Sequence, residues 1–544
     1  MHSPSMHGPS MYSPSMHSRV MRRELPEAAG LSAADMLRLL RFDPHPVALT
    51  GSWAGGGAVV SSGPARVATG RAAADRVVRT SGEPRIEPLS GMLTMPQDDE
   101  AAKFGGGWIG YLGYGFAARL HALPPASGGA RRLPDWWFGR YDHVLVQDPG
   151  TGNWTFEAIL GPDDDARQQA WLAELARRLR DPVRAAGSRP FALTDFELIP
   201  SAAQHREAVA RAVELIRAGD MFQANITLRL GAACTGDPLD VFCAGIERLS
   251  PPYAAFLRVS RDKAIASFSP ELFLRRTGGI VSTSPIKGTC ERSDDPATAR
   301  RQRRALVASA KNRAENVMIV DLMRSDLSRV CLPGSVTVPR LAAAEAHPGV
   351  WHLVSDVRGE LSSGQTDAGI IAATFPPGSV TGAPKVRAME IISELECIPR
   401  EAYTGAIGYR SPVAGLEFNV AIRTFEFAAG RLWLGAGGGI VAASDPAAEY
   451  AESLAKARPL IAAIGGGLGA AHPGEPVASP RAAALAMWPR PAAGVFTALP
   501  VRDGEPDGLT EHLARLAASA REVYGKELPP QLAGRIFDCL DGSG

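Results

Sequence analysis

The sequence lacks the features that mark secreted, membrane-spanning and nucleic-acid-binding proteins. It has six cysteines in 544 residues, with no CxxC pair and no His spacing that suggests zinc, and isolated thiols in a long chain are typical of the cytosol. No apolar run approaches the roughly 20 residues that span a bilayer, and the N-terminus lacks the apolar core of a secretory signal. Lys and Arg number 58 against 57 Asp and Glu, so no global field favours nucleic acid or an anionic membrane. We therefore expect a soluble cytoplasmic protein that acts on a small molecule, without a nucleic-acid or membrane partner.

Composition divides the chain into five parts. The first 18 residues repeat Met, His, Ser and Pro with almost no aliphatic side chains, and we expect a disordered tail over residues 1–23. A β-rich subdomain over 30–190 and a larger catalytic region over 195–464 follow. A Gly/Pro/Ala linker is predicted over 465–485, and residues 490–544 form a short terminal segment.

Apolar patterning predicts an α+β fold. Segments such as "HPVALTGSW" and "LEFNVAIRTFEF" are rich in β-branched and aromatic residues, as strands are, and a "TGG" turn is predicted at 277–279. Helices are predicted over 166–180, 203–218 and 296–328. Because strands and helices do not alternate as βαβ units, we expect large antiparallel sheets with helices packed outside and two subdomains around a central cleft.

Lys287 stands in the tight sequence "SPIKGT". Such a lysine is either a solvated charge or a reactive amine. With an ordinary pKa of about 10.4, only about one lysine in a thousand is neutral at physiological pH, so a nucleophilic role requires burial or a nearby cation.

Three acidic residues are candidates for metal binding. Glu449 and Glu452 lie three apart on a helix that begins near Asp445, and the alternative for them is a surface helix with a Glu452–Lys456 ion pair. Glu315 precedes the apolar "NVMIVDLM", where an ionised carboxylate is costly unless it is paired or holds a metal. Two such helices converging on one cleft would suit Mg²⁺.

Two glycine-containing segments and one arginine are candidates for anion binding. In "FPPGSVTGAPKVRAMEIISEL", Gly378 and Gly382 permit close backbone approach, the following helix start can bind a carboxylate or a phosphate, and Val386, Met389, Ile392 and Leu395 are predicted as a buried stripe. "GAGGGIV" lacks the third glycine and the βαβ unit of a dinucleotide site. Arg423 lies in an otherwise apolar strand, and its partner is either an acidic side chain or a ligand.

These segments together resemble the chorismate-utilising enzymes, in the order typical of that family over about residues 200–460. They are "SFSPELF", "SPIKGT", "NRAENVMIVDLMRSDLSRV", "WHLVSDVRGEL", "FPPGSVTGAPKVRAMEIISELE", "YTGAIGYR", "FNVAIRT" and "GAGGGIVAASDPAAEYAESLAKA". The resemblance implies the fold of anthranilate synthase component I. Lysine in the middle of Pro-Ile-x-Gly-Thr, where anthranilate synthases carry alanine, and Asn316 after Glu315 resemble component I of the aminodeoxychorismate synthases.

The resemblance implies that Lys287 attacks C2 of chorismate while the C4 hydroxyl leaves, and that ammonia then enters at C4 and expels the lysine. The ammonia would come from a glutaminase partner, because no segment resembles a Cys/His glutaminase signature. The site residues implied are, for catalysis, Lys287, Glu271 and His352; for substrate binding, Thr381, Gly382, Lys385, Tyr403, Arg423 and Gly438; and for Mg²⁺, Glu315, Glu452 and Glu449. A histidine such as His352 is otherwise more often a satisfied core residue.

Three departures from the family pattern bear on the mechanism. Asn312 stands where anthranilate synthases have a further acid, so the proton donor is open; Ser325 replaces the asparagine of "RND"; and "LSPPYAAF" differs from "NPxPY" in the region where relatives bind tryptophan. The alternatives are an anthranilate synthase component I and a non-catalytic chorismate-binding regulatory subunit. Retention of the catalytic and acidic residues argues against the latter.

The end of the chain, from about residue 493, resembles the beginning of 4-amino-4-deoxychorismate lyase, a pyridoxal-phosphate enzyme. The catalytic lysine of that enzyme would lie beyond residue 544. We therefore expect no lyase activity and no pyridoxal-phosphate binding from this segment.

Overall fold

The computed structural model describes residues 19–70, 87–90, 102–121, 123, 132–161, 164–180 and 187–469, with isolated positions between 501 and 532. The chain forms two compact units, Met1–Ala478 and Ser479–Gly544. The boundary between them falls inside the segment 465–485, and the predicted domain bounds otherwise remain predictions. In the second unit, β24 (Val501–Arg502) pairs antiparallel with β25 (Glu505–Pro506). Most of the predicted lyase-like segment lies outside the described residues.

The first sheet has thirteen strands within the described part of the chain. Its main path runs β1 (Arg19–Glu24), β8 (Trp154–Leu160), β7 (His143–Gln147), β3 (Gly57–Ser61), β2 (Val47–Gly51), β12 (Tyr253–Ser260), β13 (Lys263–Ser269), β22 (Thr424–Ala428), β23 (Arg431–Ile440), β11 (Gln223–Thr235) and β10 (Glu197–Ile199), and both β9 (Ala192–Leu193) and β19 (Gly382–Ala383) pair with β11.

The second sheet has ten strands over the same residues. Its order is β16 (Ile286–Glu291), β18 (Val350–Glu360), β15 (Ile280–Ser284), β14 (Leu272–Thr277), β21 (Gly415–Val420), β20 (Ala406–Ser411), β5 (Gly107–Leu112), β6 (Trp136–Tyr141) and β4 (Arg66–Gly70), with β17 (Thr337–His347) on β18. Gly278 and Gly279 form the predicted turn between β14 and β15. Each sheet combines strands from both predicted subdomains, so these segments interleave.

Ten α-helices lie in the described ranges of the first unit. They are α1 (Ala33–Leu39), α2 (Tyr114–Leu120), α3 (Asp165–Leu179), α5 (Ala202–Arg217), α6 (Pro238–Leu249), α7 (Pro296–Ala308), α8 (Ala310–Ser328), α9 (Asp367–Thr374), α10 (Lys385–Leu395) and α11 (Pro446–Ala463). Short 3₁₀ turns are η1 (Pro26–Ala28), η2 (Trp53–Gly55), η3 (Glu87–Leu89) and η4 (Gly378–Val380).

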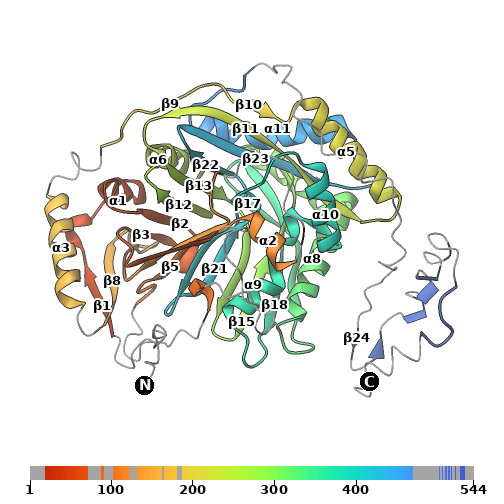
Figure 1. Ribbon diagram of the computed structural model, residues 1–544, viewed down its shortest axis with the longest axis horizontal. Coiled ribbons are helices and arrows are strands. Elements are labelled where there is room, and N and C mark those ends of the chain that lie inside the picture. Colours follow the sequence, from red (N-terminus) through yellow and green to blue (C-terminus); the bar gives the residue numbers. More distant parts are fainter. Residues whose placement is uncertain are drawn as a thin grey trace, which may run out of the picture. The chain divides into compact units, whose positions relative to one another are not determined.

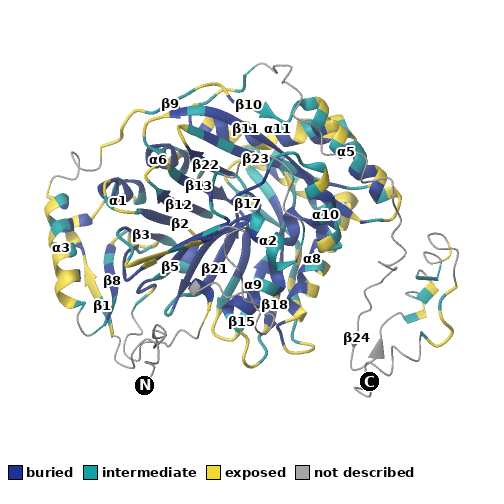
Figure 2. Ribbon diagram, viewed as in Figure 1, coloured by how far each residue is buried: buried dark blue, intermediate teal, exposed yellow. Residues whose placement is uncertain are grey.

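The two sheets pack face to face with helices outside, which confirms the predicted α+β class (Figure 1). Leu49 and Ile265 of the first sheet share a buried core with Ile109 and Ile407 of the second. A second core joins the first sheet to helices such as α1, α6 and α11, and a third joins the second sheet to α8 and α9. Figure 2 shows these interior strands as buried and the outer helix faces as exposed.

Sequence periodicity located the helices well but misplaced two details. α3 and α5 begin one residue before their predicted starts, and the predicted 296–328 helix is broken at Ser309, which ends α7 and caps α8. Val386 is exposed, because α10 buries the face that carries Ala388, Met389 and Ile392 instead. The stripe predicted through Val386 was therefore wrong at that position.

The predicted disordered tail extends too far. Residues 19–23 belong to β1, which pairs antiparallel with β8 in register from Arg19 opposite Leu160 to Glu24 opposite Thr155. Met21 packs against the core between the first sheet and helices α1, α6 and α11. Pairing with an existing strand supplies backbone hydrogen bonds, which composition alone does not reveal. Residues 1–18 lie outside the described residues.

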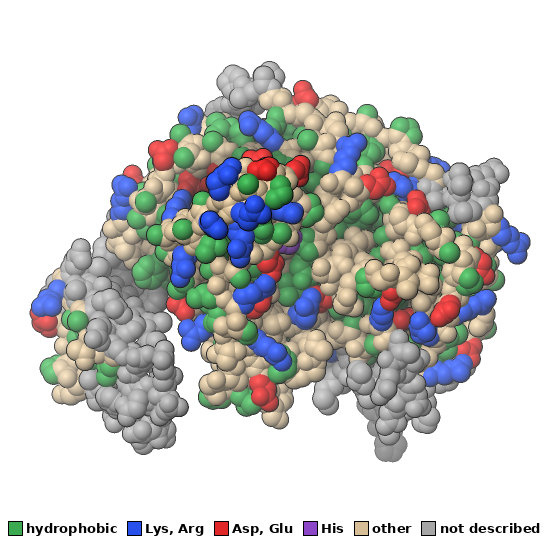
Figure 3. Space-filling model, turned by 180° about the vertical axis from the view of Figure 1, so that it is seen from behind, with side chains coloured by type: hydrophobic (Ala, Val, Ile, Leu, Met, Phe, Trp, Pro, Cys, Tyr) green, Lys and Arg blue, Asp and Glu red, His purple; other side chains and the backbone are tan. Residues whose placement is uncertain are grey.

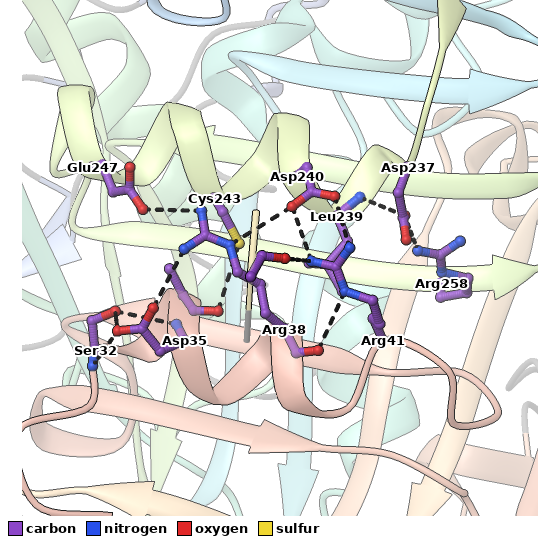
Figure 4. Close-up of polar contacts among 12 residues, drawn as sticks. Ser32, Asp35, Arg38, Arg41, Asp237, Leu239, Asp240, Cys243, Glu247 and Arg258 are labelled. Carbon is purple, nitrogen blue, oxygen red and sulfur yellow. Dashed lines mark hydrogen bonds and ion pairs between the residues drawn. The ribbon is translucent and has the colours of Figure 1, made fainter. Parts of the chain in front are cut away.

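A buried ion-pair network joins α1 to α6 (Figure 4). Arg41 donates two hydrogen bonds to Asp240, at 3.1 and 3.0 Å, and both side chains are almost fully buried. Arg38 lies 3.7 Å from the same carboxylate and also contacts Asp35 and Glu247. The network fixes the first helix of the chain to a helix some 200 positions later.

Within the described residues, the helices are all too short or too polar to cross a lipid bilayer.

We predict that Asp240→Ala lowers the free energy of unfolding by about 3 to 5 kcal/mol, because it leaves two buried guanidinium groups without their shared carboxylate. The matched control is Glu247→Gln, which removes the exposed partner of Arg38 and should cost under about 1 kcal/mol. Urea unfolding of both variants measures the difference. Equal losses would contradict a dominant role for the buried pair.

Candidate active site

Lys287 lies in an irregularity of the edge strand β16. The pairing of β16 with β18 shifts between Ile286 and Thr289, so Lys287 and Gly288 form a bulge, a feature common beside active sites. Gly288 has a φ of +92°, and a Cβ there would lie 3.2 Å from Cβ of Asn312 on α8. The "KG" pair thus satisfies two needs, because the glycine permits both the left-handed turn and the close approach of α8.

The Lys287 amine is held among charged groups. Its Nζ donates a hydrogen bond of 2.9 Å to the Ser379 carbonyl. Burial lowers the pKa of Lys287, and Lys456 lowers it further, while the carboxylates of Glu271, Glu315 and Glu452 act in the opposite direction. The net direction is toward the neutral amine, which is the nucleophilic form.

Glu271 lies between β13 and β14, where it is almost completely buried. Its Oε1 accepts a hydrogen bond of 3.3 Å from the Ile286 amide, next to Lys287. Burial raises the pKa of Glu271, although Lys287 and Arg423 oppose the shift. A carboxyl group with a raised pKa beside an amine is suited to donate a proton.

Arg423 contributes a guanidinium group, without an ion-pair partner in the described structure, to the site around Lys287 and Glu271. The residue has a φ of +51° between β21 and β22, and its backbone carbonyl accepts from the Phe268 amide at 2.9 Å. No hydrogen bond or ion pair of its side chain is present among the described residues, although it interacts electrostatically with Glu271. The sequence left open which group pairs with Arg423. Among the described residues, no carboxylate forms an ion pair with its guanidinium.

His352 lies directly opposite Thr289 on the neighbouring strand β18. Its Nδ1 is 2.8 Å from the Thr289 hydroxyl, and its buried Nε2 has no partner within the described ranges. Burial, reinforced by the positive charge of Arg423, lowers the pKa of His352 to about 3. The imidazole is therefore neutral.

The acidic residues of α8 and α11 converge on Lys287. Burial raises the pKa of Glu315, and Glu449 and Glu452 raise it further while Lys287 lowers it, so the three carboxylates act on one another. Burial also favours the neutral form of Glu452, but Lys456, 2.8 Å away, holds the pKa of Glu452 below its usual value. The Glu452–Lys456 ion pair, the alternative interpretation from the sequence, is present, and the carboxylates of α8 and α11 lie within electrostatic range of one another.

Gly438 on β23 faces these carboxylates. A Cβ at Gly438 would lie 3.1 Å from Oε2 of Glu449 and 4.0 Å from Oε1 of Glu452. The Ser444 hydroxyl donates to Glu449 Oε1 at 2.6 Å, and Lys456 donates to the Gly437 carbonyl at 3.0 Å. In the part of the chain that the structure describes, no three His, Cys, Asp or Glu side chains are close enough to form a complete metal cage.

Thr381 and Gly382 come shortly after Ser379, whose carbonyl accepts the hydrogen bond from Lys287. Thr381 is fully buried and its hydroxyl donates to the Pro377 and Gly378 carbonyls, at 3.1 and 3.2 Å. Gly382 pairs with β11, and a Cβ there would lie 2.0 Å from the Gln223 carbonyl oxygen, so no side chain fits.

Lys385 is already saturated. Its Nζ donates to the Asp326 carboxylate and to the carbonyls of Thr374 and Pro376, which accounts for all three donors of an ammonium. The side chain anchors the 374–376 segment to α8. This geometry leaves no donor for a substrate carboxylate.

The ring of Tyr403 packs against Gly435 of β23, which lies three residues before Gly438. A Cβ at Gly435 would lie 2.2 Å from Cδ1 of the Tyr403 ring, so glycine is needed there. Glu426 accepts a hydrogen bond of 2.8 Å from the Tyr403 amide. The Tyr403 hydroxyl has no hydrogen-bond partner among the side chains and backbone described.

Sequence reasoning missed Gln223 and the role of Lys456. The Gln223 side chain is fully buried, both of its amide atoms are unpartnered within the described structure, and Nε2 is 2.7 Å from the position of a Cβ on Gly439. Buried amides are rarely left unpaired, so Gln223 is a candidate for binding a ligand or an internal water. The available signal was a polar side chain in the otherwise apolar start of a strand.

A small apolar pocket of about 50 Å³ lies apart from these residues. It is lined by parts of α2 and α10 and by residues 398–401, including Tyr114, Met389 and Arg400. None of the candidate site residues lines it. We therefore place the chemistry at Lys287 rather than in this pocket.

Comparison with known proteins gives a consistent set of relatives. The family model for chorismate binding enzymes matches residues 53–462. Aminodeoxychorismate synthase component 1 of Salmonella typhimurium is 40% identical over 370 residues, covering 67% of this chain and 78% of that protein. Anthranilate synthase component 1 of Streptomyces coelicolor is 39% identical over 375 residues, covering 66% and 73%.

A solved structure has the same architecture. Anthranilate synthase component I from Streptococcus pneumoniae aligns with a TM-score of 0.65 at 29% identity, over 74% of this chain and 91% of that one. The sandwich of two antiparallel sheets with outer helices is therefore that of a known enzyme fold.

We predict that stability falls on acidification because His352 is buried in its neutral form. Its ordinary pKa of 6.5 is lowered to about 3 in the folded protein. Below pH 6.5 the unfolded chain binds a proton that the folded chain does not, so each pH unit down to about 3 costs about 1.4 kcal/mol. His205, buried with a pKa lowered to about 4, acts in the same direction.

The measurement is the free energy of unfolding of wild type and His352→Gln between pH 7 and pH 5. In the variant, the slope of the free energy of unfolding against pH should correspond to about one proton fewer. The part of the slope that is due to His205 should remain. A slope equal to that of the wild type would show that His352 is not the buried neutral group.

Proposed function

The chain belongs to the chorismate-binding enzymes, and on this premise we propose that it is component I of an aminodeoxychorismate synthase. It transfers an amino group to chorismate and forms 4-amino-4-deoxychorismate, the precursor of 4-aminobenzoate in folate biosynthesis. Relatives with this name are 35 to 40% identical over two thirds of the chain.

The observation that carries the proposal is the environment of Lys287. A half-buried lysine whose amine has a lowered pKa, held in a strand bulge beside a buried carboxyl group, is the arrangement required of a lysine nucleophile. A solvated charge on an edge strand would need neither the bulge nor the burial. Lysine at this position also distinguishes the chain from anthranilate synthases.

The proposed reaction is two successive displacements. The neutral Lys287 Nζ attacks C2 of chorismate, the two conjugated ring double bonds shift, and the C4–O bond breaks. Glu271 donates a proton to the leaving hydroxyl, which departs as water, because hydroxide is a poor leaving group. Ammonia then attacks C4, the two double bonds shift back and the C2–N bond to Lys287 breaks, so that nitrogen remains at C4 and its extra proton returns to Glu271.

Substrate binding falls to the groups left unpaired around Lys287. The free guanidinium of Arg423 is suited to one carboxylate of chorismate in a bidentate manner. We assign the Tyr403 hydroxyl and the backbone at Thr381, Gly382 and Gly438 to the same task. Lys385 is omitted from this set because its three donors are used within the protein. The neutral His352 is placed beside the reacting ring.

Mg²⁺ fits the acidic side of the site. Glu315 and Glu452, supported by Glu449, supply a small number of carboxylates from two helices, and Mg²⁺ usually binds one or two carboxylates together with waters and substrate oxygens. When bound, Mg²⁺ would neutralise a substrate carboxylate and favour the uncharged form of Lys287. Without a cation these carboxylates would repel the dianionic substrate.

The nitrogen source is proposed to be a glutaminase partner. The relatives are named as component 1, which implies a second component. Free ammonium should replace that partner in vitro. Five described cysteines are free thiols, in keeping with the expected cytoplasmic location, which stays a prediction.

An anthranilate synthase component I is the second candidate, because a relative of that name is 39% identical. Direct attack of ammonia at C2 would lead toward anthranilate, which fluoresces, whereas 4-amino-4-deoxychorismate does not aromatise unaided. A non-catalytic regulatory subunit is disfavoured by the intact set of Lys287, Glu271, Glu315 and Glu452.

We predict that wild type, given chorismate, Mg²⁺ and ammonium, forms 4-amino-4-deoxychorismate, and that Lys287→Ala lowers turnover by about 10³-fold or more. Lys287→Arg should fail as completely, because a guanidinium stays protonated. Mass and fluorescence identify the product, and the intact mass of quenched enzyme tests for a covalent adduct on Lys287. Unchanged turnover and regiochemistry in Lys287→Ala would refute the proposal.

We predict that Glu315→Gln and Glu452→Gln each raise the Mg²⁺ concentration required for half-maximal activity by about tenfold or more, because each removes one anionic oxygen ligand. Glu207→Gln, on the exposed face of α5, is the matched control and should leave the requirement unchanged. Mg²⁺ titration of the ammonium-dependent rate measures the effect. An unaltered Mg²⁺ requirement in both variants would exclude these carboxylates as ligands.

A further inference from the structure

An exposed basic surface covers the strand that carries Lys287. Between residues 296 and 313, on α7 and the first turn of α8, the chain has six cations and no acidic residue. Lys and Arg side chains gather in one patch on the face drawn in Figure 3. We call this the α7 basic surface, and its exposed members are Arg300, Arg301, Arg303, Arg304, Lys311 and Arg313.

The arginines of this surface differ from those on other helices. Arg177 pairs with Glu174 at 2.8 Å, Arg211 with Glu214 at 2.6 Å and Arg324 with Asp321 at 3.0 Å. The α7 arginines, in contrast, form no ion pair with any described residue. Since the whole chain carries a net charge of only +1, this is a local concentration of unpaired charge and not part of a generally basic protein.

The α7 basic surface adjoins the C-terminal end of the strand that carries Lys287. Gln302 on α7 accepts a hydrogen bond of 2.9 Å from the Ser293 amide just after β16, and its carbonyl contacts the Cys290 thiol. Lys311 lies 4.0 Å from Glu315. Beyond Glu315, the side chains of Glu452 and Lys456 are about half exposed, at 53% and 49%, and they form the open edge of the site.

The screening length and the length of α7 together favour a macromolecular surface, and not the small substrate, as the partner of these charges. Exposed charges act over about 8 Å at physiological ionic strength, and α7 is about 20 Å long, from 13 residues at about 1.5 Å each. A single dicarboxylate within the site is screened from most of them, whereas an acidic protein surface lying on α7 meets all of them together. The patch also repels ammonium from solution but not neutral ammonia.

We propose that the α7 basic surface docks an acidic face of the ammonia-supplying glutaminase partner. This inference rests on the proposed function and names the surface through which it operates. Docking there would place the partner beside the open edge formed by Glu452 and Lys456. Ammonia from the partner would then reach the active site around Lys287 without release to bulk solvent.

The test replaces the four unpaired arginines by glutamine, which keeps helix propensity. The variant is R300Q/R301Q/R303Q/R304Q. The matched control removes four exposed arginines elsewhere and is R22Q/R23Q/R206Q/R261Q. The probe is a purified glutamine-hydrolysing subunit of an aminodeoxychorismate synthase from the same source organism. Rates are measured against its concentration with glutamine, and separately with ammonium alone.

We expect the concentration of partner at half-maximal glutamine-dependent rate to rise about tenfold or more in the α7 variant. Its dependence on salt should weaken, and its ammonium-dependent rate should equal or slightly exceed that of wild type. The control variant should match wild type in every assay.

Two outcomes would overturn the docking proposal alone. One is an unchanged partner requirement in the α7 variant. The other is an equal loss with glutamine and with ammonium accompanied by a higher KM for chorismate, which would assign the charges to the substrate. Failure of wild type to aminate chorismate with ammonium would instead overturn the proposed function, and the docking proposal with it.

Discussion

The amine of Lys287 has to remain uncharged among three carboxylates, and the rest of the proposed site depends on this constraint. Burial is the strongest influence on its pKa and acts in the required direction. The same burial raises the pKa of Glu271 and Glu315, so the carboxyl groups also shift toward their neutral forms and attract a proton on the amine less. Burial therefore brings the pKa of the amine and the pKa of the carboxyl groups closer together, which favours proton transfer between them.

The fold meets this constraint with residues from both sheets and from two helices. Lys287 and His352 lie on adjacent strands of the second sheet, and Gly438 lies on β23 of the first. α8, near the middle of the catalytic region, carries Glu315, and α11, near its end, carries Glu452. Close approach is possible because glycine occupies the contact points, where a Cβ at Gly288 or Gly438 would lie 3.1 to 3.2 Å from the neighbouring side chains.

Helices and strands were predictable from the sequence because apolar periodicity is a local property, and α3, α5 and the β14–β15 turn fell where it placed them. The order of strands in the two sheets was not, since pairing joins segments hundreds of residues apart. Motif resemblance named the candidate site residues, but it could not state which of them have polar groups that are not already used within the protein. Lys385 is an example, because only the structure reveals that Asp326 and two carbonyls use its donors. Gln223 is the converse case, an unpaired amide that no motif marked.

Asn312 illustrates how one departure from the family pattern agrees with the chemistry at Lys287. Its side chain packs against Gly288, the residue that follows Lys287 in the chain. A carboxylate in that position would add a negative charge beside Lys287 and raise its pKa, which would disfavour the nucleophile. A neutral amide avoids this cost. In the proposed mechanism the proton for the departing hydroxyl then comes from Glu271, which has a raised pKa and accepts a hydrogen bond from the Ile286 amide.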